Sequence, residues 1–208
     1  MLTRYFNDDN RKILLLRHGE LDTGGHKVYV GQANVPLNAT GVSRAHTWGK
    51  VMQNFGVGTI ISSDLKRCAE TAQIIAAKLK LGVELNKNWR EISFGEWDGR
   101  DFEEIKQEYP DMVAERHADF LHMRPPGGEN FLDLQERVIR AFEALLQRES
   151  DGRILVVTHA GVMRTLLAYL MGLPAENIFH IFQDFACLNI IDAKDGQFRH
   201  VRAVNLLN

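Results

Sequence analysis

The sequence predicts an α/β fold, a three-layer α/β/α sandwich in which a mainly parallel sheet lies between two layers of helices. Short apolar runs that suit buried strands alternate with longer stretches of helical periodicity, which is the pattern of strand–helix–strand units. The chain has 208 residues, of which 45% are hydrophobic and 25% are charged. We therefore expect a single globular domain over residues 1–208.

Three continuous apolar runs have the character of strands that are buried on both faces. They are Ile13–Leu16, Thr59–Ile61 and Ile154–Thr158, and polar residues follow each of them at once. Two further strands are predicted near the end of the chain. These are Leu188–Ile191 and the alternating run Phe198–Val204, which suits an edge of the sheet.

Between the strands, apolar residues recur at steps of three and four, which is the spacing of one helix face. Four helices are expected: one with Thr40 as its N-cap, one along Leu65–Leu79, one along Phe131–Leu145, and one that begins just after His159. The segment from about 97 to 130 is rich in charged residues and interrupts the alternation of strands and helices. We expect it to form a helical, cap-like excursion over one end of the sheet.

Charge and cysteine content narrow the class of function. Lys and Arg (25) nearly balance Asp and Glu (27), so a basic face that binds nucleic acid or an anionic membrane is not expected. Cys68 and Cys187 lie in apolar-patterned stretches, which predicts buried thiols. The sequence shows no signal-like or membrane-length apolar run, so we expect a cytoplasmic protein. A homodimer stays open beside a monomer.

Arginines and histidines, which carry or can carry positive charge, follow the three buried strands. Arg17 and His18 follow the first, Arg67 lies one turn into the helix after the second, and His159 follows the third. Because the carboxyl ends of parallel strands share one edge, these side chains can converge there. Guanidinium groups and the helix start at Ala160-Gly161 suit an oxyanion. We expect a neutral histidine there to attack phosphorus, since nearby cations disfavour its protonation.

Four segments of the sequence resemble the motifs of a known family. The segment Leu14–Glu20 resembles the signature of the histidine phosphatase superfamily, whose fold is phosphoglycerate-mutase-like. Gly31–Gly41, Ser62–Ala72 and Val157–Gly161 resemble further segments of that family in the same order. The likeness covers about residues 11–205, nearly the whole chain.

The resemblance implies a phosphomonoesterase that acts on a small-molecule phosphomonoester through a phosphohistidine. It implies His18 as the nucleophile and Glu91, within the segment Arg90–Gly99, as the proton donor. The remaining implied site residues surround the phosphate: Arg17, Arg67 and His159, with Gly19 and Ala160 as substrate-binding positions. No metal or other cofactor is implied. A metallohydrolase built on His18, His26 and His159 is the alternative.

Within the superfamily, the compact length and the segments Gly31–Leu37, Glu91–Gly99 and Pro126–Glu129 resemble the α-ribazole phosphatases of cobalamin biosynthesis. This likeness implies α-ribazole 5′-phosphate as the substrate. The flat base of that molecule would need an apolar platform. The candidates for it are Tyr29, Phe94, Trp97, Phe102 and Met112.

One position departs from the family pattern. Gly24 stands where many members have an Asn that contacts phosphate. Either this donor is missing, or Thr23 or Lys27 replaces it.

Other functions stay open at this stage. A sugar-phosphate phosphatase, a fructose-2,6-bisphosphatase-like enzyme or a phosphoglycerate mutase is the enzymatic alternative. A bisphosphate substrate would need a second cationic patch, for which the candidates are Arg116, His117, His122 and Arg124. A binding module that has lost catalysis is the other class. The presence of His18, Glu91 and His159 together argues against it.

Overall fold

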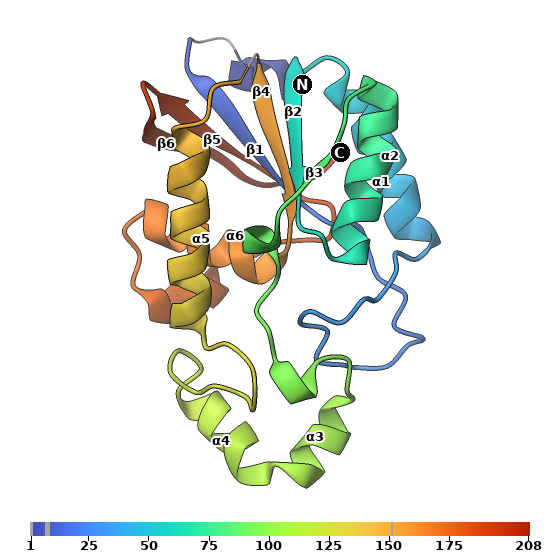
Figure 1. Ribbon diagram of the computed structural model, residues 1–208, viewed down its shortest axis with the longest axis vertical. Coiled ribbons are helices and arrows are strands. Elements are labelled where there is room, and N and C mark those ends of the chain that lie inside the picture. Colours follow the sequence, from blue (N-terminus) through green and yellow to red (C-terminus); the bar gives the residue numbers. More distant parts are fainter. Residues whose placement is uncertain (1, 7–8, 151) are drawn as a thin grey trace.

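The computed structural model describes residues 2–6, 9–150 and 152–208. Within them one mixed sheet has the strand order β3-β2-β4-β1-β5-β6 (Figure 1). The strands are β1 (Arg11–Arg17), β2 (Val57–Ser62), β3 (Glu84–Leu85), β4 (Arg153–Thr158), β5 (Leu188–Lys194) and β6 (Gln197–Leu206). Strands β1 to β4 run parallel, whereas β5 is antiparallel to both of its neighbours.

The five predicted strands are confirmed, each within a few residues of its expected bounds. Strand β6 lies at an edge of the sheet, as its alternating pattern predicts. The sequence analysis missed β3 at the opposite edge. Its two residues are exposed, so they carry no apolar pattern that would reveal a strand.

Helices cover both faces of the sheet, which confirms the three-layer architecture (Figure 1). The main helices are α1 (Ala39–Met52), α2 (Lys66–Leu79), α5 (Phe131–Leu146) and α6 (Ala160–Leu170). Short 3₁₀ turns lie at η1 (Leu2–Phe6), η2 (Lys87–Trp89), η3 (Gly95–Trp97) and η4 (Ala175–His180). In the described parts of the chain, no helix combines the length and the apolar character needed to cross a membrane.

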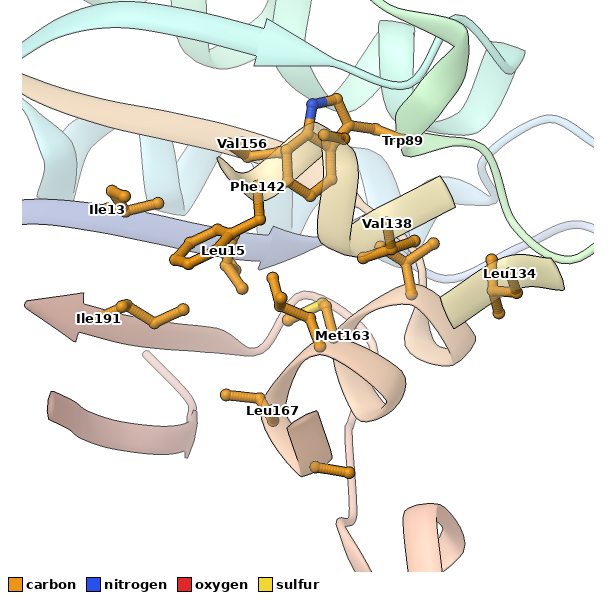
Figure 2. Packing of buried hydrophobic residues seen from close by; sticks show 14 of the residues in the cluster. Ile13, Leu15, Trp89, Leu134, Val138, Phe142, Val156, Met163, Leu167 and Ile191 are labelled. Atoms are coloured by element: carbon orange, nitrogen blue, oxygen red, sulfur yellow. The ribbon is translucent and has the colours of Figure 1, made fainter. Parts of the chain in front are cut away.

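Side chains of β1 alternate between the two apolar layers, as the pleat of a strand requires. Leu14 and Leu16 belong to the cluster under α1 and α2. Ile13 and Leu15 belong to the cluster under α5 and α6, where Phe142 packs against the sheet (Figure 2). Because both faces of the strand are buried, its sequence is continuously apolar.

The predicted cap at the first helix is wrong by two positions. Helix α1 begins at Ala39, and its N-cap is Asn38, whose side chain accepts the N–H of Gly41 at 2.8 Å. Thr40 lies inside the first turn. Asn and Thr are both common N-caps, and the backbone decides between them because Asn38 is the residue in extended conformation.

The segment from about 97 to 130 contains two short helices, α3 (Phe102–Glu108) and α4 (Pro110–Ala118). Figure 1 shows both beyond one end of the sheet. They pack on a small apolar cluster of their own, formed by Trp97, Ile105, Val113 and Met123. This cluster holds the helices in a fixed arrangement away from the two main layers.

Candidate active site

A pocket of about 430 Å³ lies where the predicted site residues converge. The register of the sheet aligns Arg17 with Thr158 and Ser62 with Val157, so β1, β2 and β4 end at one edge. Five of the seven predicted site residues line the pocket, and the other two, Gly19 and His159, are adjacent in sequence to lining residues. The five that line it are Arg17, His18, Arg67, Glu91 and Ala160.

Backbone hydrogen bonds fix His18 at the end of β1. Its N–H donates to the carbonyl of Thr158 at 3.0 Å, and its own carbonyl accepts the N–H of Ala186 at 3.0 Å. The Nδ1 atom lies 2.7 Å from the carbonyl of Gly19. A carbonyl only accepts, so this contact assigns the ring proton to Nδ1 and leaves the lone pair on Nε2.

Gly19 allows the turn after β1 to touch the start of α1. A Cβ atom at this position would lie 2.6 Å from the carbonyl oxygen of Gly41. The Gly19 N–H donates to Thr71 Oγ1 in α2 at 3.2 Å. The turn that carries His18 is thus fixed by two helices, and a side chain at residue 19 would displace it.

Arg17 is buried beside His18 and keeps part of its donor capacity free. Its Nη1 donates to the carbonyl of Gln183 at 2.7 Å, and its guanidinium carbon lies 3.8 Å from the ring centroid of Phe185. Its Nε is buried and has no hydrogen-bond partner among the described residues. Burial lowers the pKa of Arg17 to about 10, so the side chain stays cationic at neutral pH.

Arg67 links the second and third strand ends. Its Nε donates to Nδ1 of His159 at 3.2 Å, and its two terminal nitrogens donate to the carbonyls of Ala33 and Gly31 at 2.8 and 2.5 Å. The guanidinium is therefore held in one orientation at the pocket wall. The loop after the family signature, rather than a carboxylate, orients this arginine.

His159 lies beside His18, with 5.2 Å between their ring centroids. It is fully buried and does not line the pocket. Because its Nδ1 accepts from Arg67, the ring proton lies on Nε2, which is 2.9 Å from Ser63 Oγ. The structure thus brings the two histidines together but places His159 behind the pocket wall.

The environment keeps both imidazoles neutral. Burial lowers the pKa of His18 well below 6.5, and the charges of Arg67 and Arg17 lower it further. Burial and the charge of Arg67 lower the pKa of His159 in the same way. A neutral imidazole has a free lone pair, so His18 has the protonation state that a nucleophile needs.

Glu91 is anchored by two backbone N–H groups. Its Oε1 accepts from Ile92 and its Oε2 from Gly161, each at 3.0 Å. A Cβ atom on residue 161 would lie 2.3 Å from Oε1, which explains the glycine at the start of α6. The Gly161 N–H is therefore used by Glu91, whereas the sequence analysis expected it to face the anion.

Glu96 and Asp98, the other two carboxylates of the segment Arg90–Gly99, have structural roles. Asp98 accepts the N–H groups of Gln32 and Phe94 at 3.1 and 3.0 Å and so fixes the loop around Glu91. Glu96 accepts from the hydroxyl of Tyr109 at 3.4 Å on the surface. Neither residue lines the pocket.

Three of the five candidates for an apolar platform line the pocket. Tyr29, Phe94 and Phe102 line the pocket, whereas Trp97 and Met112 pack in the cluster beneath α3 and α4. Sequence reasoning missed three further aromatic residues in the lining: Phe131, Phe179 and Phe185. Helical periodicity marks such residues as apolar, but it does not separate a pocket wall from a core.

The cationic patch is only partly as predicted. Of the four candidates, Arg116 lines the pocket. His122 and Arg124 form exposed ion pairs with Asp119 and Asp133, and His117 is exposed. Arg164, which was not predicted, lines the pocket as well. It lies four residues after Ala160, and this helical spacing is a signal that identifies it.

The loop around Gly24 does not supply the missing phosphate donor. Leu21 and Val28 line the pocket, whereas Thr23 and Lys27 do not. His26 is exposed on the same loop. Within the described part of the chain, no group of three or more His, Cys, Asp or Glu is placed to hold a metal ion, so the triad of His18, His26 and His159 is not gathered.

The chain belongs to the histidine phosphatase superfamily. The family profile described as histidine phosphatase superfamily (branch 1) matches residues 13–206. This match includes both histidine segments, both arginine segments and Glu91. The protein is thus a phosphatase-family enzyme whose substrates are small phosphate esters.

Several relatives carry more specific names. The chain is 30% identical over 194 residues to the adenosylcobalamin/alpha-ribazole phosphatase of Escherichia coli K12, covering 93% of this chain and 95% of the relative. The crystal structure of the alpha-ribazole phosphatase from Shigella flexneri matches with a TM-score of 0.83 and 29% identity, covering 95% and 100% of the two chains. YhfR of Bacillus stearothermophilus matches with a TM-score of 0.83 and 29% identity, covering 93% and 96%.

Proposed function

We propose that the protein hydrolyses α-ribazole 5′-phosphate through a phosphohistidine on His18. The observation that carries this proposal is the pocket itself. It holds a neutral, oriented imidazole between guanidinium groups at one end and aromatic side chains at the other. The names of the relatives in Escherichia coli and Shigella flexneri supply the particular substrate.

In the first step, the phosphate binds at the end of the pocket that contains Arg17 and Arg67. The free donors of Arg17 neutralise the phosphoryl oxygens. His159 supports this arrangement from behind the wall by accepting the Nε–H of Arg67. Fixed donors of this kind stabilise the charge that develops on the phosphoryl oxygens in the transition state.

In the second step, the lone pair on Nε2 of His18 attacks phosphorus. The N–P bond forms while the bond from phosphorus to the ester oxygen breaks, and Glu91 gives its proton to the departing alkoxide. A water molecule then attacks the phosphohistidine and loses its proton to Glu91. The N–P bond breaks, and inorganic phosphate and neutral His18 are released.

Aromatic side chains form the opposite part of the pocket and suit the flat base of the substrate. Tyr29 packs on Phe94 and Phe102, with ring centroids 5.2 and 4.3 Å apart. Rings in such clusters present both edges and faces to a planar ligand. Tyr29 comes from the loop before α1, Phe94 directly precedes η3, and Phe102 begins α3. Phe102 thus belongs to the 97–130 segment, which we propose as a cap within one domain over residues 1–208.

A kinetic panel tests the substrate. We expect kcat/KM to be highest for α-ribazole 5′-phosphate when it is compared with fructose 2,6-bisphosphate, 3-phosphoglycerate and p-nitrophenyl phosphate. The base should add binding energy that the smaller esters lack. A higher kcat/KM for one of the other three esters would reject α-ribazole 5′-phosphate as the preferred substrate.

His18→Ala tests the nucleophile. This variant should lose turnover with every ester in the panel, because it cannot form the N–P bond. Wild-type enzyme quenched during turnover of ³²P-labelled substrate should carry acid-labile label, and the variant should carry none. Thermal unfolding checks that the variant is folded. Substantial activity of the folded variant, with wild-type contamination excluded, would reject this assignment.

A further inference from the structure

Two arginines of the pocket have no task in the proposed reaction. Arg116 comes from α4 and Arg164 from α6, and both line the pocket. The guanidinium carbon of Arg116 lies 5.7 Å from the ring centroid of Phe131, and that of Arg164 lies 5.7 Å from the ring centroid of Phe179. The centroids of these two rings are 5.6 Å apart. The two guanidiniums therefore flank one aromatic pair.

This pair is distinct from the two arginines whose charges act on His18. Arg17 stacks on Phe185, and Arg67 is hydrogen-bonded to His159. The arginine charges that lower the pKa of His18 are those of Arg67 and Arg17. Arg116 instead stacks over Phe94, at 4.8 Å from the ring centroid. Arg116 therefore lies among the aromatic side chains of the pocket, whereas Arg164 lies near enough to Arg17 and Glu91 for its charge to lower the pKa of Arg17 and for the charge of Glu91 to raise its own.

Arg116 and Arg164 share a single lining carboxylate, among the described residues, with the other arginines of the pocket. Among the described residues that line the pocket, Glu91 is the one carboxylate, against four arginines. A phosphomonoester dianion together with ionised Glu91 leaves one positive charge unbalanced, and protonated Glu91 leaves two. Keeping a partly buried cation without an opposite charge costs free energy. A second anionic group on the ligand would remove this cost.

Of the two arginines, Arg116 more clearly lacks an ion-pair or hydrogen-bond partner among the described residues. It forms no ion pair with a carboxylate in the described part of the chain, and its Nη1 is buried there without a hydrogen-bond partner. Burial lowers its pKa. Its neighbours are aromatic faces, which orient a guanidinium but accept no conventional hydrogen bond. An oxyanion would supply the acceptor that this side chain lacks.

We propose that Arg116 and Arg164 form a subsite for a second anionic group of the substrate, a carboxylate, phosphate or phosphodiester. The inference rests on the proposed function for the position of the first phosphate, at Arg17 and Arg67. It extends the substrate class from α-ribazole 5′-phosphate, which has no second anionic group, to phosphomonoesters that carry one at a distance from the scissile phosphate. Arginine suits this task because its donors match planar and tetrahedral oxyanions.

Matched ligand pairs test the subsite. Inhibition constants are measured against hydrolysis of p-nitrophenyl phosphate, so that the ligands need not be turned over. One pair is α-ribazole 5′-phosphate and α-ribazole 3′,5′-bisphosphate. The other pair is fructose 6-phosphate and fructose 1,6-bisphosphate. In at least one pair, the wild-type enzyme should bind the doubly anionic member about tenfold more tightly, the gain expected for one charge-assisted hydrogen bond.

Three substitutions identify the residues responsible. Arg116→Met and Arg164→Met should each reduce the preference to about twofold or less, whereas Arg116→Lys should keep part of it. Arg124→Met is the matched control, because Arg124 lies on the same segment as Arg116 but pairs with Asp133 at the surface. This control should keep the full preference.

The outcomes separate this inference from the proposed function. A preference in the fructose pair alone, with α-ribazole 5′-phosphate a poor ligand, would support the subsite and reject the proposed substrate. Tight binding of α-ribazole 5′-phosphate without any preference in either pair would support the substrate and overturn the subsite. Equal weakening of both members of a pair by Arg116→Met or by Arg164→Met would also overturn it, because a structural defect acts in that way.

Discussion

One backbone hydrogen bond decides which nitrogen of His18 is free to attack. The carbonyl of Gly19 lies 2.7 Å from Nδ1, so Nε2 carries the lone pair. Burial, Arg67 and Arg17 keep the ring neutral. Orientation and protonation state are thus set by separate contacts.

The pH profile tests the protonation state. The pKa of His18 is lowered well below 6.5, so His18 is neutral at pH 6.5 and becomes protonated only at lower pH. We expect kcat to stay high at pH 6.5 and its acid limb to lie below that value. Arg17→Met removes one cation and should move the limb to higher pH. A limb at the same pH in both enzymes would contradict this account.

Glu91→Gln tests proton donation. Alkyl phosphates have poor leaving groups that need the proton, so their hydrolysis should slow by about a hundredfold or more. Hydrolysis of p-nitrophenyl phosphate should slow by less than about tenfold, because its leaving group departs as a stable anion. Glu96→Gln, outside the pocket lining, is the control. Equal slowing of both ester classes in Glu91→Gln would argue against Glu91 as the donor.

At the scale of elements, the segment 183–187 before β5 holds the end of β1. The carbonyl of Gln183 accepts from Arg17 Nη1, and the N–H of Ala186 donates to the carbonyl of His18. The buried amide of Asn189 in turn donates to Gln183 Oε1 at 2.7 Å. A segment far along the chain thereby positions both residues of the signature.

Phe185→Leu tests this support. The substitution keeps an apolar side chain but removes the ring that stacks on Arg17. We expect the inhibition constant of inorganic phosphate to rise about fivefold, within the range of a cation–π contact. Phe182→Leu is the matched control, because Phe182 is 64% exposed in the same region and does not line the pocket. An unchanged constant in Phe185→Leu would contradict the role of the ring.

At the scale of the whole molecule, stability and function depend on opposite ends of the sheet. Lys12 and Asp192 form a fully buried ion pair at 2.8 Å between β1 and β5. Lys12 precedes Arg17 by five residues, a separation of about 17 Å along an extended strand. The charges in the core at this end therefore have no direct contact with the pocket.

Lys12→Met tests this separation. Asp192 loses its buried partner Lys12 but keeps its ion pair with Arg202, so the free energy of unfolding should fall by about 1–3 kcal/mol, less than for a buried charge left without any partner. The turnover number per folded molecule should stay within a factor of about two. Urea denaturation and kinetics at 25 °C measure the two effects, with Lys50→Met on the exposed face of α1 as the control. A large loss of turnover in folded Lys12→Met would show that the two ends are coupled.

Five of the six strands, the four main helices and the convergence of Arg17, His18 and Arg67 at one edge of the sheet could be predicted from the amino-acid sequence. The spacing of apolar residues and the ends of the strands are local properties of the sequence. Because parallel strands end at the same edge of a sheet, the residues that follow them are expected to lie together. Glu91 required the family resemblance, because nothing local separates it from Glu96 or Asp98.

Which residues surround the pocket could be learned only from the folded chain. It placed His159 behind the wall, Trp97 in a separate core and Arg164 in the pocket. The physical reason is that periodicity assigns a residue to a face of its own element. Which segment then packs against that face, and whether a gap remains there, depends on contacts between residues far apart in the chain.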